Sequence, residues 1–402
     1  MSSQKVSEVP AGNTEPTMVD VAIVGAGMAG TTLATLLGRA GRRVALIDPH
    51  QTHPDEFRAE KLGTGQARLF EKLGLDATVQ PLMTPMDDIH VFRLGQLFSR
   101  ERRLEYGFSY GALINGLRAA LPHQVPLTVA KVAEITTGPD KQRLVLNTGA
   151  IIEARLVVVS TGHSEALRRA VGVRRIEDSK AHSLSIGFDL AIAPGECAFQ
   201  TVTCFGRRAE DRIAYLSVFP IGGTMRANMF VYRQAGEPWT KAFRKEPQKM
   251  LCELMPEIAA QCGNFKVGGP VEIRPIDLTR TEGHRRDGVV FIGDAFCTTC
   301  PTPGVGIERV MTDVDQLHSL HIPRWLETPG MAADKICAFY DDPVKIAADE
   351  NGMRASYYAK AITIGTGLEW RIRRLRNNTA RQLMIVGRKM KHLGQRRSPG
   401  LA

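Results

Sequence analysis

Hydrophobic and polar positions near the N-terminus follow first a strand pattern, then a helix pattern and then a strand pattern again. Residues 19–24 are mostly apolar, residues 31–39 place apolar side chains at helical spacing, and Val44–Asp48 is a second apolar run. The uncharged segment 21–38 holds four glycines and three threonines, so we interpret it as strand, turn and helix rather than a membrane span. The order of these elements predicts a βαβ unit with parallel strands.

The middle of the chain has the alternation of antiparallel strands. Short segments between residues 182 and 233 alternate apolar and polar side chains, which is typical of a sheet with one face available to a ligand. Helices are expected at 61–75 and 110–121, where leucines recur at helical spacing, and in most of the chain beyond residue 304. The apolar runs 155–160 and 288–294 predict two further buried strands.

Composition and charge divide the chain into a neutral body and a basic tail. The chain has 402 residues, of which 43% are hydrophobic, and this is enough to form a large core. Its net charge of +10 lies in residues 370–402, which contain ten Lys or Arg and no Asp or Glu. The seven cysteines are few and odd in number, which argues against a disulfide scaffold. Residues 1–17 are polar and lack an apolar stretch, so we expect a flexible leader rather than a signal peptide. We therefore expect a cytoplasmic protein.

The turn after the first strand has the spacing of a dinucleotide-binding motif. Gly25-x-Gly27-x-x-Gly30 follows a strand and opens a helix, and Asp48 ends the next strand. The first glycine allows a tight turn, the second allows close approach of a pyrophosphate, and the third allows close packing of helix and strand. The start of the helix offers free N–H groups to phosphates, and the Asp48 carboxylate can accept ribose hydroxyls. This motif alone does not separate FAD from NAD.

A second glycine-bearing motif lies far along the chain. Gly293-Asp294-Ala295 follows a predicted strand, and the residues after it include Pro301, Gly304, Gly306 and Asp313. Together with the first turn and Asp48, this motif resembles the FAD-dependent aromatic monooxygenases of the para-hydroxybenzoate hydroxylase type, the group A flavoprotein monooxygenases. The resemblance extends over about residues 19–320.

The resemblance implies a role for each of these cofactor residues. Asp294 would hydrogen-bond the ribityl chain of FAD, and Arg58 would lie near the FAD phosphates. Backbone N–H groups at 304–307 would face the pyrimidine end of the flavin, where the start of a helix stabilises negative charge on the reduced ring. The segment 212–223 resembles the strand of the family that contributes to the substrate sheet.

The patterns and the resemblance together predict an α/β fold. We expect a Rossmann-like FAD-binding domain, an inserted antiparallel-sheet substrate domain and a C-terminal helical segment. The FAD-binding domain is assigned to 18–80, 101–180 and 280–325. The sheet domain is assigned to 81–100 and 181–279, and residues 326–402 form the helical region with the basic tail.

By this resemblance the protein is an FAD-dependent monooxygenase, or hydroxylase. Reduced FAD and dioxygen would form a flavin hydroperoxide that oxygenates an aromatic or other electron-rich small molecule, in secondary metabolism. The electron donor is expected to be NADPH or NADH, or else reduced flavin supplied from elsewhere. A halogenase, a prenyl-chain reductase and a flavoprotein that modifies a protein partner would fit the same cofactor motifs. The isolated positions of Trp239, Trp325 and Trp370 disfavour the halogenase, because halogenases carry a Trp-x-Trp motif.

The sequence departs from the family pattern in four places. Cys297 stands where the family has the histidine of Gly-Asp-Ala-Ala-His, Glu308 replaces an asparagine, and Asn115 replaces an arginine. Residues 160–164 lack the aspartate of the family's Asp-Gly motif, which is tied to the handling of NAD(P)H. The prediction of FAD therefore rests on more residues than the prediction of its electron donor.

Four residues are candidates for substrate binding, namely His182, Tyr215, Phe219 and Pro301. His182 opens a strand of the predicted sheet, and Tyr215 and Phe219 lie on another strand, where either core packing or contact with a planar substrate is open. Cys297 and Cys300 have the spacing of a redox dithiol, but packing of two small side chains in a loop is the favoured interpretation. No second Cys or His pair completes a zinc site, and we predict no metal.

The basic tail has two interpretations that the sequence leaves open. Its cations alternate with apolar residues such as Leu375 and Leu383, which is typical of a helix that lies on an anionic membrane or contacts an acidic partner. The second interpretation is a solvated basic helix packed on the body. Nucleic acid is not expected, because the tail carries no aromatic-interleaved basic surface.

Overall fold

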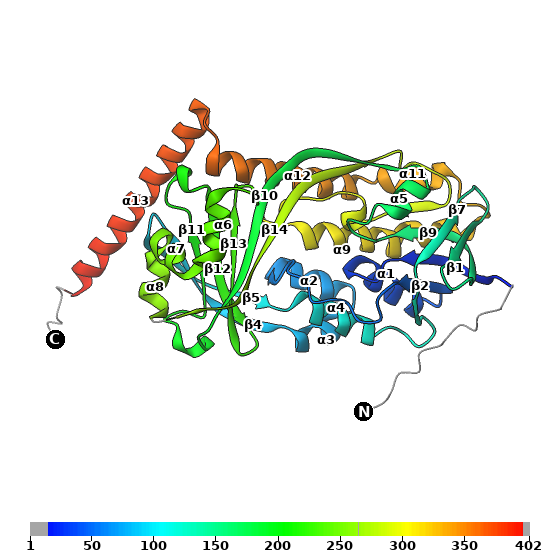
Figure 1. Cartoon of the computed structure of the whole chain (residues 1–402), viewed down its shortest axis with the longest axis horizontal. Coiled ribbons are helices and arrows are strands. Elements are labelled where there is room, and N and C mark those ends of the chain that lie inside the picture. The colour runs from blue at the N-terminus through cyan, green and yellow to red at the C-terminus, as the bar shows by residue number, and fades with distance from the viewer. Residues whose placement is uncertain (1–14, 264, 397–402) are drawn as a thin grey trace.

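The structure is a computed structural model and describes residues 15–263 and 265–396, with side chains described up to residue 387. Residues 1–14 of the predicted leader and residues 397–402 of the basic tail lie outside the described residues. Two sheets stand side by side along the long axis of the molecule, and helices cover their faces (Figure 1).

The first sheet has seven strands, in the order β6-β2-β1-β9-β8-β7 with β15 beside β9. β1 pairs in parallel with β2 and with β9, which confirms the predicted βαβ unit and the buried strand near 155–160. The bounds are β1 (Thr17–Val24), β2 (Val44–Asp48), β6 (Leu127–Val129), β7 (Val132–Thr136), β8 (Gln142–Leu146), β9 (Ile151–Val159) and β15 (Val289–Phe291).

The second sheet has eight strands, in the order β14-β10-β13-β12-β11-β4-β5-β3, and is antiparallel except where β11 meets β4. The predicted alternation over 182–233 is therefore confirmed as sheet. The long strands β10 and β14 pair with each other and extend from this sheet toward the first one (Figure 1). The bounds are β3 (Lys61–Gly63), β4 (Thr84–Arg93), β5 (Gln96–Gly107), β10 (Arg174–Leu190), β11 (Thr201–Phe205), β12 (Ile213–Ile221), β13 (Thr224–Val231) and β14 (Val267–Glu282). β5 and β10 cross the division points proposed at residues 100 and 180.

The predicted helix at 61–75 is shorter than expected. Lys61–Gly63 is strand β3, because its backbone pairs with β5, and α2 (Thr64–Lys72) begins only after it. The helix predicted at 110–121 is α4 (Tyr110–Ala119), and the C-terminal part of the chain is helical as predicted. The remaining helices are α1 (Met28–Arg39), α3 (Asp76–Val79), α5 (Ala166–Ala170), α6 (Pro238–Lys245), α7 (Pro247–Leu254), α8 (Pro256–Cys262), α9 (Gly306–Gln316), α10 (Ile322–Glu327), α11 (Ala333–Tyr340), α12 (Pro343–Ile364) and α13 (Leu368–Arg396). Short helical turns are η1 (Gln80–Leu82), η2 (Pro194–Glu196), η3 (Ala209–Asp211), η4 (Gly293–Ala295) and η5 (Leu317–His321).

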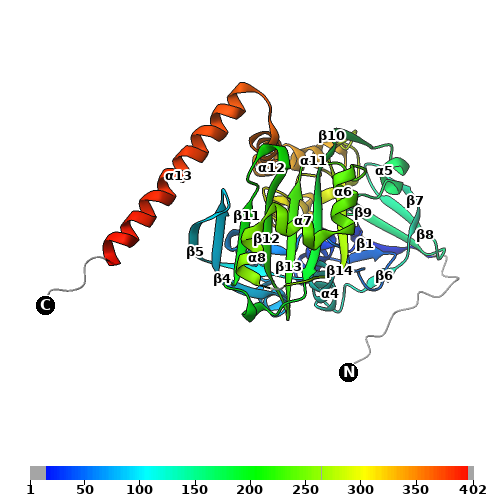
Figure 2. The ribbon, with the colours of Figure 1, turned by 60° about the vertical axis from the view of Figure 1, so that its left-hand side comes forward.

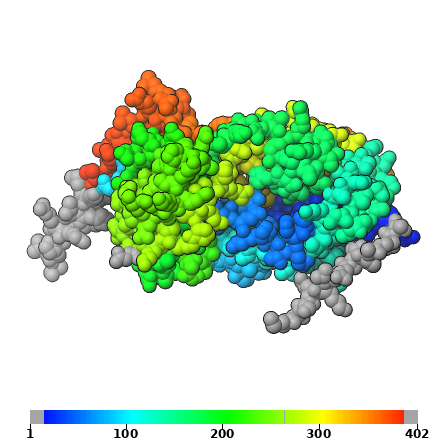
Figure 3. Space-filling model, viewed as in Figure 1, coloured from blue at the N-terminus to red at the C-terminus, as the bar shows by residue number. Residues whose placement is uncertain are grey.

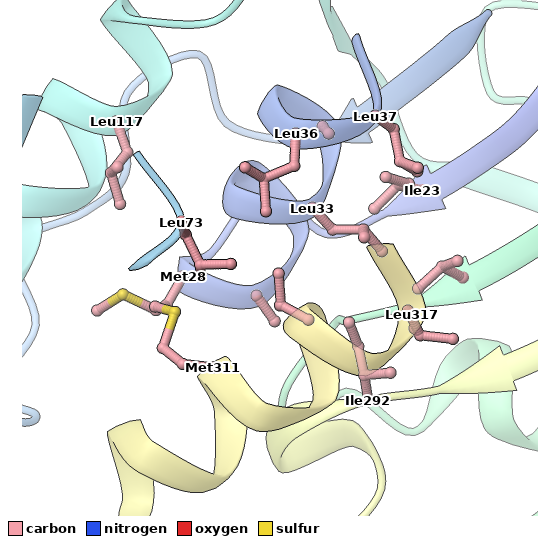
Figure 4. Packing of buried hydrophobic residues seen from close by; sticks show 14 of the residues in the cluster. Ile23, Met28, Leu33, Leu36, Leu37, Leu73, Leu117, Ile292, Met311 and Leu317 are labelled. Carbon is pink, nitrogen blue, oxygen red and sulfur yellow. The ribbon is translucent and has the colours of Figure 1, made fainter. Parts of the chain in front are cut away.

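The largest hydrophobic core fixes α1 between the first sheet and the C-terminal helices. Leu33 and Leu37 of α1 are buried beside Ile23 of β1, and Ile292, which follows β15, and Leu317, which follows α9, join the same cluster (Figure 4). A separate core lies between the second sheet and helices α6 to α8. The first core fixes the elements on both sides of the first glycine turn, and the second core fixes the second sheet. Close packing makes both parts rigid.

The C-terminal helix α13 turns away from α12 and slopes along one end of the molecule (Figures 1 and 2). In the space-filling view, the orange and red atoms of this region stand out from the body (Figure 3). None of the helices that the structure describes combines the length and the apolar character that crossing a bilayer requires.

Candidate cofactor and substrate site

The glycine turn between β1 and α1 has the backbone that its sequence predicts. Gly25 has φ +102°, and a Cβ on it would lie 2.6 Å from the carbonyl oxygen of Ser160. A Cβ on Gly30 would lie 1.9 Å from the carbonyl oxygen of Gly25. Around Gly27, in contrast, no atom lies within 4 Å of the Cβ position. The turn is therefore closed on the protein side and open at Gly27, in front of the N-terminus of α1.

Asp48 at the end of β2 is hydrogen-bonded to the glycine turn and also lines the cleft in front of it. Its carboxylate accepts hydrogen bonds from the backbone N–H groups of Ala26, at 2.8 Å, and His50, at 2.9 Å. Arg118 of α4, which sequence reasoning missed, lies 3.4 Å from the same carboxylate and donates to the carbonyl oxygen of Ala26. Arg118 lies four residues after Ile114 and three before Leu121 on the predicted helix 110–121, and a cation among these apolar positions was the signal that could have identified it. A carboxylate has further lone pairs, so Asp48 can still accept a ligand hydroxyl.

Asp294 lies in the turn η4 beside two arginines and a histidine. Its carboxylate is 3.2 Å from Arg309, 3.4 Å from Arg58 and 3.9 Å from His163. Burial alone raises the pKa of Asp294, but the charges of Arg309, His163, Arg58 and Arg274 outweigh it and hold the pKa below its ordinary value. Asp294 is therefore ionised at neutral pH within a locally positive site.

Arg58 and Arg274 reach this site from two different elements. Arg58 pairs with Glu56 at 2.5 Å and lies over the ring of Tyr110. Arg274 comes from β14 of the second sheet and donates to the carbonyl oxygen of Phe57 at 3.2 Å. Burial lowers the pKa of Arg274, and the nearby charge of Arg58 adds to this shift. Sequence reasoning missed Arg274, because nothing in a strand pattern marks which residue points toward a distant loop.

One cleft of about 560 Å³ joins the two glycine-bearing motifs. Its lining includes Gly25, Gly27, Asp48, Arg58 and Asp294, so residues predicted from separate parts of the sequence meet in one place. Thr161 also lines it, with a buried hydroxyl that has no hydrogen-bond partner in the described chain. An open glycine, helix N–H groups, an unsatisfied hydroxyl and nearby arginines are features that a pyrophosphate-linked dinucleotide requires, so these residues fit FAD.

Of the other three glycines predicted to contact the cofactor, one lines the cleft and two do not. Gly293 joins the cleft lining and has φ +60°. Gly304 and Gly306 are not among the residues that line the cleft. Gly304 has φ +73° and accepts a hydrogen bond from Gln66, and Gly306 begins α9 with open space at its Cβ position.

Behind Asp294 lies a buried ionic network that sequence reasoning missed in part. Asp313 accepts from the backbone N–H of Gly293 at 2.9 Å and from Lys345 of α12 at 2.8 Å. Lys345 also pairs with Asp349 at 3.0 Å, and Arg309 lies 3.6 Å from Asp349. Asp313 belonged to the predicted motif, whereas Lys345 and Asp349 lie beyond the region of resemblance. The network fixes the turn η4 from the side opposite the cleft.

The predicted substrate residues lie on strands β10 and β12 of the second sheet and on the loop after η4. Tyr215 donates to the carbonyl oxygen of Thr302 at 2.9 Å, next to the half-buried Pro301. Phe219 is fully buried, and the ammonium group of Lys61 lies 5.9 Å from the centre of its ring. His182 is 1% exposed, and its ring nitrogens contact Ser179 and the carbonyl oxygen of Ser356. Burial lowers the pKa of His182 to about 4, with a smaller contribution from Lys360, so its ring is neutral.

The two faces of the second sheet differ in polarity. One face packs on α6 to α8 through residues such as Leu184, Ile186 and Val218. The other face carries Ser185, Ser217 and Asn228, each at most 5% exposed. Lys61 donates to Ser217 at 3.3 Å, and a Cβ on Gly187 would lie 2.6 Å from the ring of Phe57. The polar face is therefore turned toward the loop that carries Arg58.

Cys297 and Cys300 are both buried. Burial raises the pKa of Cys297 to about 11, so its thiol is protonated at neutral pH. The thiol of Cys300 lies 3.3 Å from the hydroxyl of Ser183 and 3.1 Å from that of Thr302. These contacts fit the packing interpretation of the pair. Within the described residues, no group of three His, Cys, Asp or Glu side chains is placed to hold a metal ion.

Comparison with known proteins places this geometry in a family. A family model described as FAD binding domain matches residues 18–320. Squalene epoxidase erg1 of Schizosaccharomyces pombe is 24% identical over 315 residues, which cover 72% of this chain and 66% of that protein. 6-methylpretetramide 4-monooxygenase of Streptomyces rimosus is 25% identical over 323 residues, 74% of each chain. The chain spans no more than 66% of the length of the first curated relatives that it matches.

Solved structures share the fold over nearly the whole chain. The p-nitrophenol 4-monooxygenase PnpA of Pseudomonas putida DLL-E4 superposes with a TM-score of 0.73 at 16% identity, over 94% of this chain and 97% of that one. PqsL of P. aeruginosa, solved with 2-aminobenzoylacetate, gives a TM-score of 0.66 at 18% identity, over 87% of this chain and 97% of that one. The chain therefore belongs to the FAD binding domain family and has the fold of the group A flavoprotein monooxygenases.

Proposed function

We propose that the protein is an FAD-dependent monooxygenase that hydroxylates an aromatic or other electron-rich small molecule. The observation that carries this proposal is the cleft that joins the turn at Gly27 to Asp294 and Arg58. Phe57, the neighbour of Arg58, packs against Gly187 on the polar face of the second sheet. Bound FAD would supply the redox chemistry, in which electrons from NADPH, NADH or reduced flavin are used to activate dioxygen.

The chain's own residues would bind and orient the cofactor. Gly25, Gly27 and Gly30 would hold the pyrophosphate at the start of α1, and Asp48 would accept from the adenosine ribose. Asp294 would accept from the ribityl hydroxyls. Arg58 and Arg274 would keep the electrostatic potential positive at the same end of the cleft, which stabilises negative charge on a reduced flavin.

The polar face of the sheet favours a substrate with hydrogen-bonding groups over a pure hydrocarbon. The hydroxyl of Ser185 and the side-chain oxygen of Asn228 are buried and have no hydrogen-bond partner in the described chain. Gly187 pairs with Asn228, so Ser185 and Asn228 are diagonal neighbours on adjacent strands. A buried polar group without a partner costs about 1–3 kcal/mol, and a hydrocarbon would leave both unpaired. We infer a substrate that carries an O–H or N–H donor, such as a hydroxylated aromatic compound.

The experiment that tests this function is reduction of the purified, FAD-reconstituted protein. We expect a flavin absorbance spectrum, bleaching on anaerobic titration with NADPH or NADH, and oxygen consumption stimulated by phenolic compounds. Bleaching only with reduced flavin would identify reduced flavin as the electron donor. A protein that binds no FAD on reconstitution would contradict the proposal.

The exposed apolar face of α13 favours a second role for this helix, namely contact with an anionic membrane. Its exposed apolar side chains include Leu368 (71%), Ile372 (56%), Leu375 (68%), Leu383 (68%) and Val386 (53%). These positions share one face of a helix, whereas Ile385, on another face, is 5% exposed. The helix carries Glu369 as its only acid among many cations, so anionic lipid is a more complementary occupant than a second copy of the chain. A cytoplasmic protein bound to the inner surface of a membrane is the arrangement that we propose.

Sedimentation of the full chain with phosphatidylglycerol-containing vesicles tests this contact. We expect binding that is weaker with pure phosphatidylcholine and at high salt, and that is lost in the double variant Leu375→Gln, Leu383→Gln. Val344→Gln on α12, which replaces a side chain that is 51% exposed, is the matched control and is expected to bind normally. Equal sedimentation of both variants, or capture of an acidic protein without any vesicle binding, would contradict the proposal.

A further inference from the structure

Two cysteine thiols are in contact in the core between the second sheet and helices α6 to α8. The Sγ atoms of Cys197 and Cys262 are 3.3 Å apart, although the residues are 65 positions apart in the sequence. Cys197 follows the turn η2, and Cys262 is the last residue of α8. The approach is fixed by the backbone next to both cysteines, because the N–H of Ala198 donates to the carbonyl oxygen of Gln261 at 3.1 Å.

The two thiols differ in access and in acidity. Cys197 is half-buried, whereas Cys262 is 3% exposed. The hydrogen bond between the two thiols lowers the pKa of Cys197, against the opposing effect of burial, so Cys197 is the more nucleophilic of the two. Cys204 of β11 lies in the same core and is fully buried, and burial raises the pKa of its thiol. Cys197 is therefore the thiol of this core that an oxidant in solution meets first.

We propose that Cys197 and Cys262 form a reversible disulfide when the protein is exposed to hydrogen peroxide. The Cys197 thiolate attacks one peroxide oxygen, the O–O bond breaks, and a sulfenic acid forms as hydroxide leaves. The Cys262 sulfur then attacks the sulfenic sulfur, the S–O bond breaks and the S–S bond forms. The thiol proton of Cys262 and the leaving hydroxyl make water. Overall, two thiols lose two electrons and two protons, and one peroxide is reduced to two waters.

The cross-link has a structural consequence that does not depend on the bound cofactor. It closes the segment that contains β11, β12, β13 and helices α6 to α8, and ties the end of α8 to the loop that follows β10. A cross-link over a loop of this length restricts the unfolded chain and stabilises the native one. The oxidised protein is therefore expected to resist unfolding of the second sheet more than the reduced protein, and a thiol reductant reverses the effect.

Oxidation of the full-length protein with hydrogen peroxide tests the proposal. After denaturation, the number of titratable thiols is expected to fall by two from the seven of the reduced chain. Peptide mapping is expected to find Cys197 linked to Cys262, and Tm is expected to rise by several degrees and return on addition of dithiothreitol. Cys197→Ser is expected to abolish the link and the rise in Tm. Cys252→Ser, which changes a half-buried cysteine on the neighbouring helix α7, is the matched control and is expected to retain both.

Three results would overturn the proposal. The first is oxidation of Cys197 to a sulfinic acid while Cys262 stays reduced, and the second is a link between Cys204 and Cys262. The third is a wild-type protein in which Cys197 and Cys262 both keep their thiols under conditions that oxidise Cys337, another half-buried cysteine outside this core. The first and third need no variant, so a misfolded mutant cannot obscure them.

Discussion

Arg309 and Asp294 form an ion pair of 3.2 Å in which one partner is buried and the other is open, with side chains that are 1% and 33% exposed. Arg309 is held from behind by Asp313 and Asp349, and Asp294 lines the cleft. The protein therefore fixes one side of the Asp294 carboxylate and leaves the other side for a ligand. The carboxylate is therefore held in position by the protein before a ligand binds, as in a preorganised binding site.

Asp294→Asn is expected to weaken FAD binding by about 10- to 100-fold, because a hydrogen bond to a charged group contributes about 1.5–3 kcal/mol. The amide keeps the shape of the side chain but loses its charge, and it leaves the surrounding cations without their shared partner. Quenching of FAD fluorescence measures the change in Kd. Asp315→Asn, on the same helix as Arg309 and paired with Lys72 at 2.5 Å, is the control and is expected to bind FAD normally. Equal affinities of the Asp294 variant and the wild type would remove Asp294 from the cofactor site.

The glycine turn gives a prediction in which stability and cofactor binding separate. Gly27→Ala is expected to leave the Tm of the FAD-free protein unchanged, because the added methyl group meets no atom within 4 Å, and to weaken FAD binding at least tenfold. Gly25→Ala is expected to lower Tm by several degrees, because Gly25 has φ +102° and no room for a Cβ. Thermal unfolding and FAD titration of both variants check this. A Gly27 variant that is unstable but binds FAD normally would contradict it.

The sequence predicted the elements whose signals are local, and it brought forward as cofactor residues those that stand in short motifs. The first turn, the strands around it and the Gly-Asp motif each carry a period or spacing that one short segment defines, and the structure brings Gly27, Asp48 and Asp294 to one cleft as expected. β3 was missed because residues 61–63 become a strand only by pairing with β5, which is a long-range contact. Arg274 and Lys345 were missed for the same reason. Each reaches the site from an element whose place depends on the folded topology.

His182 gives the protein a pH-dependent stability. Its pKa in the folded protein is about 4, below the ordinary value of 6.5, so the unfolded chain binds a proton between these values while the native protein does not. The free energy of unfolding therefore keeps its full value, as far as His182 is concerned, above about pH 6.5. It falls as the pH drops toward 4, by an amount on the order of 3 kcal/mol. His182→Phe is expected to flatten the pH dependence of urea unfolding over this range. His123→Phe, at an exposed position, is the control, and a wild-type slope in the His182 variant would disprove the assignment.

Lys345 is expected to contribute to the free energy of unfolding, although it does not line the cleft. It is 1% exposed and pairs with Asp313, which is fully buried. Lys345→Met keeps most of the volume but leaves a buried carboxylate without its main partner, which costs about 3–5 kcal/mol. Urea unfolding monitored by circular dichroism measures this loss. Lys335→Met is the comparison, because the Lys335 ammonium group donates to four backbone carbonyl oxygens. Equal losses in the two variants would contradict a special role for the buried network.

The last prediction concerns the polar face of the second sheet, where stability and substrate binding are expected to change in opposite directions. Ser185→Ala removes a buried hydroxyl that has no partner in the protein, so the substrate-free protein is expected to keep or slightly raise its Tm. A substrate that uses this hydroxyl would bind about 5- to 10-fold more weakly, as expected for one hydrogen bond of about 1 kcal/mol. Thr201→Val is the matched control, because its hydroxyl already donates to the carbonyl oxygen of Val218 at 3.0 Å and its loss is expected to lower Tm without changing binding. A drop in Tm for both variants would mean that Ser185 is satisfied within the protein, and the sheet would then carry no information about the polarity of the substrate.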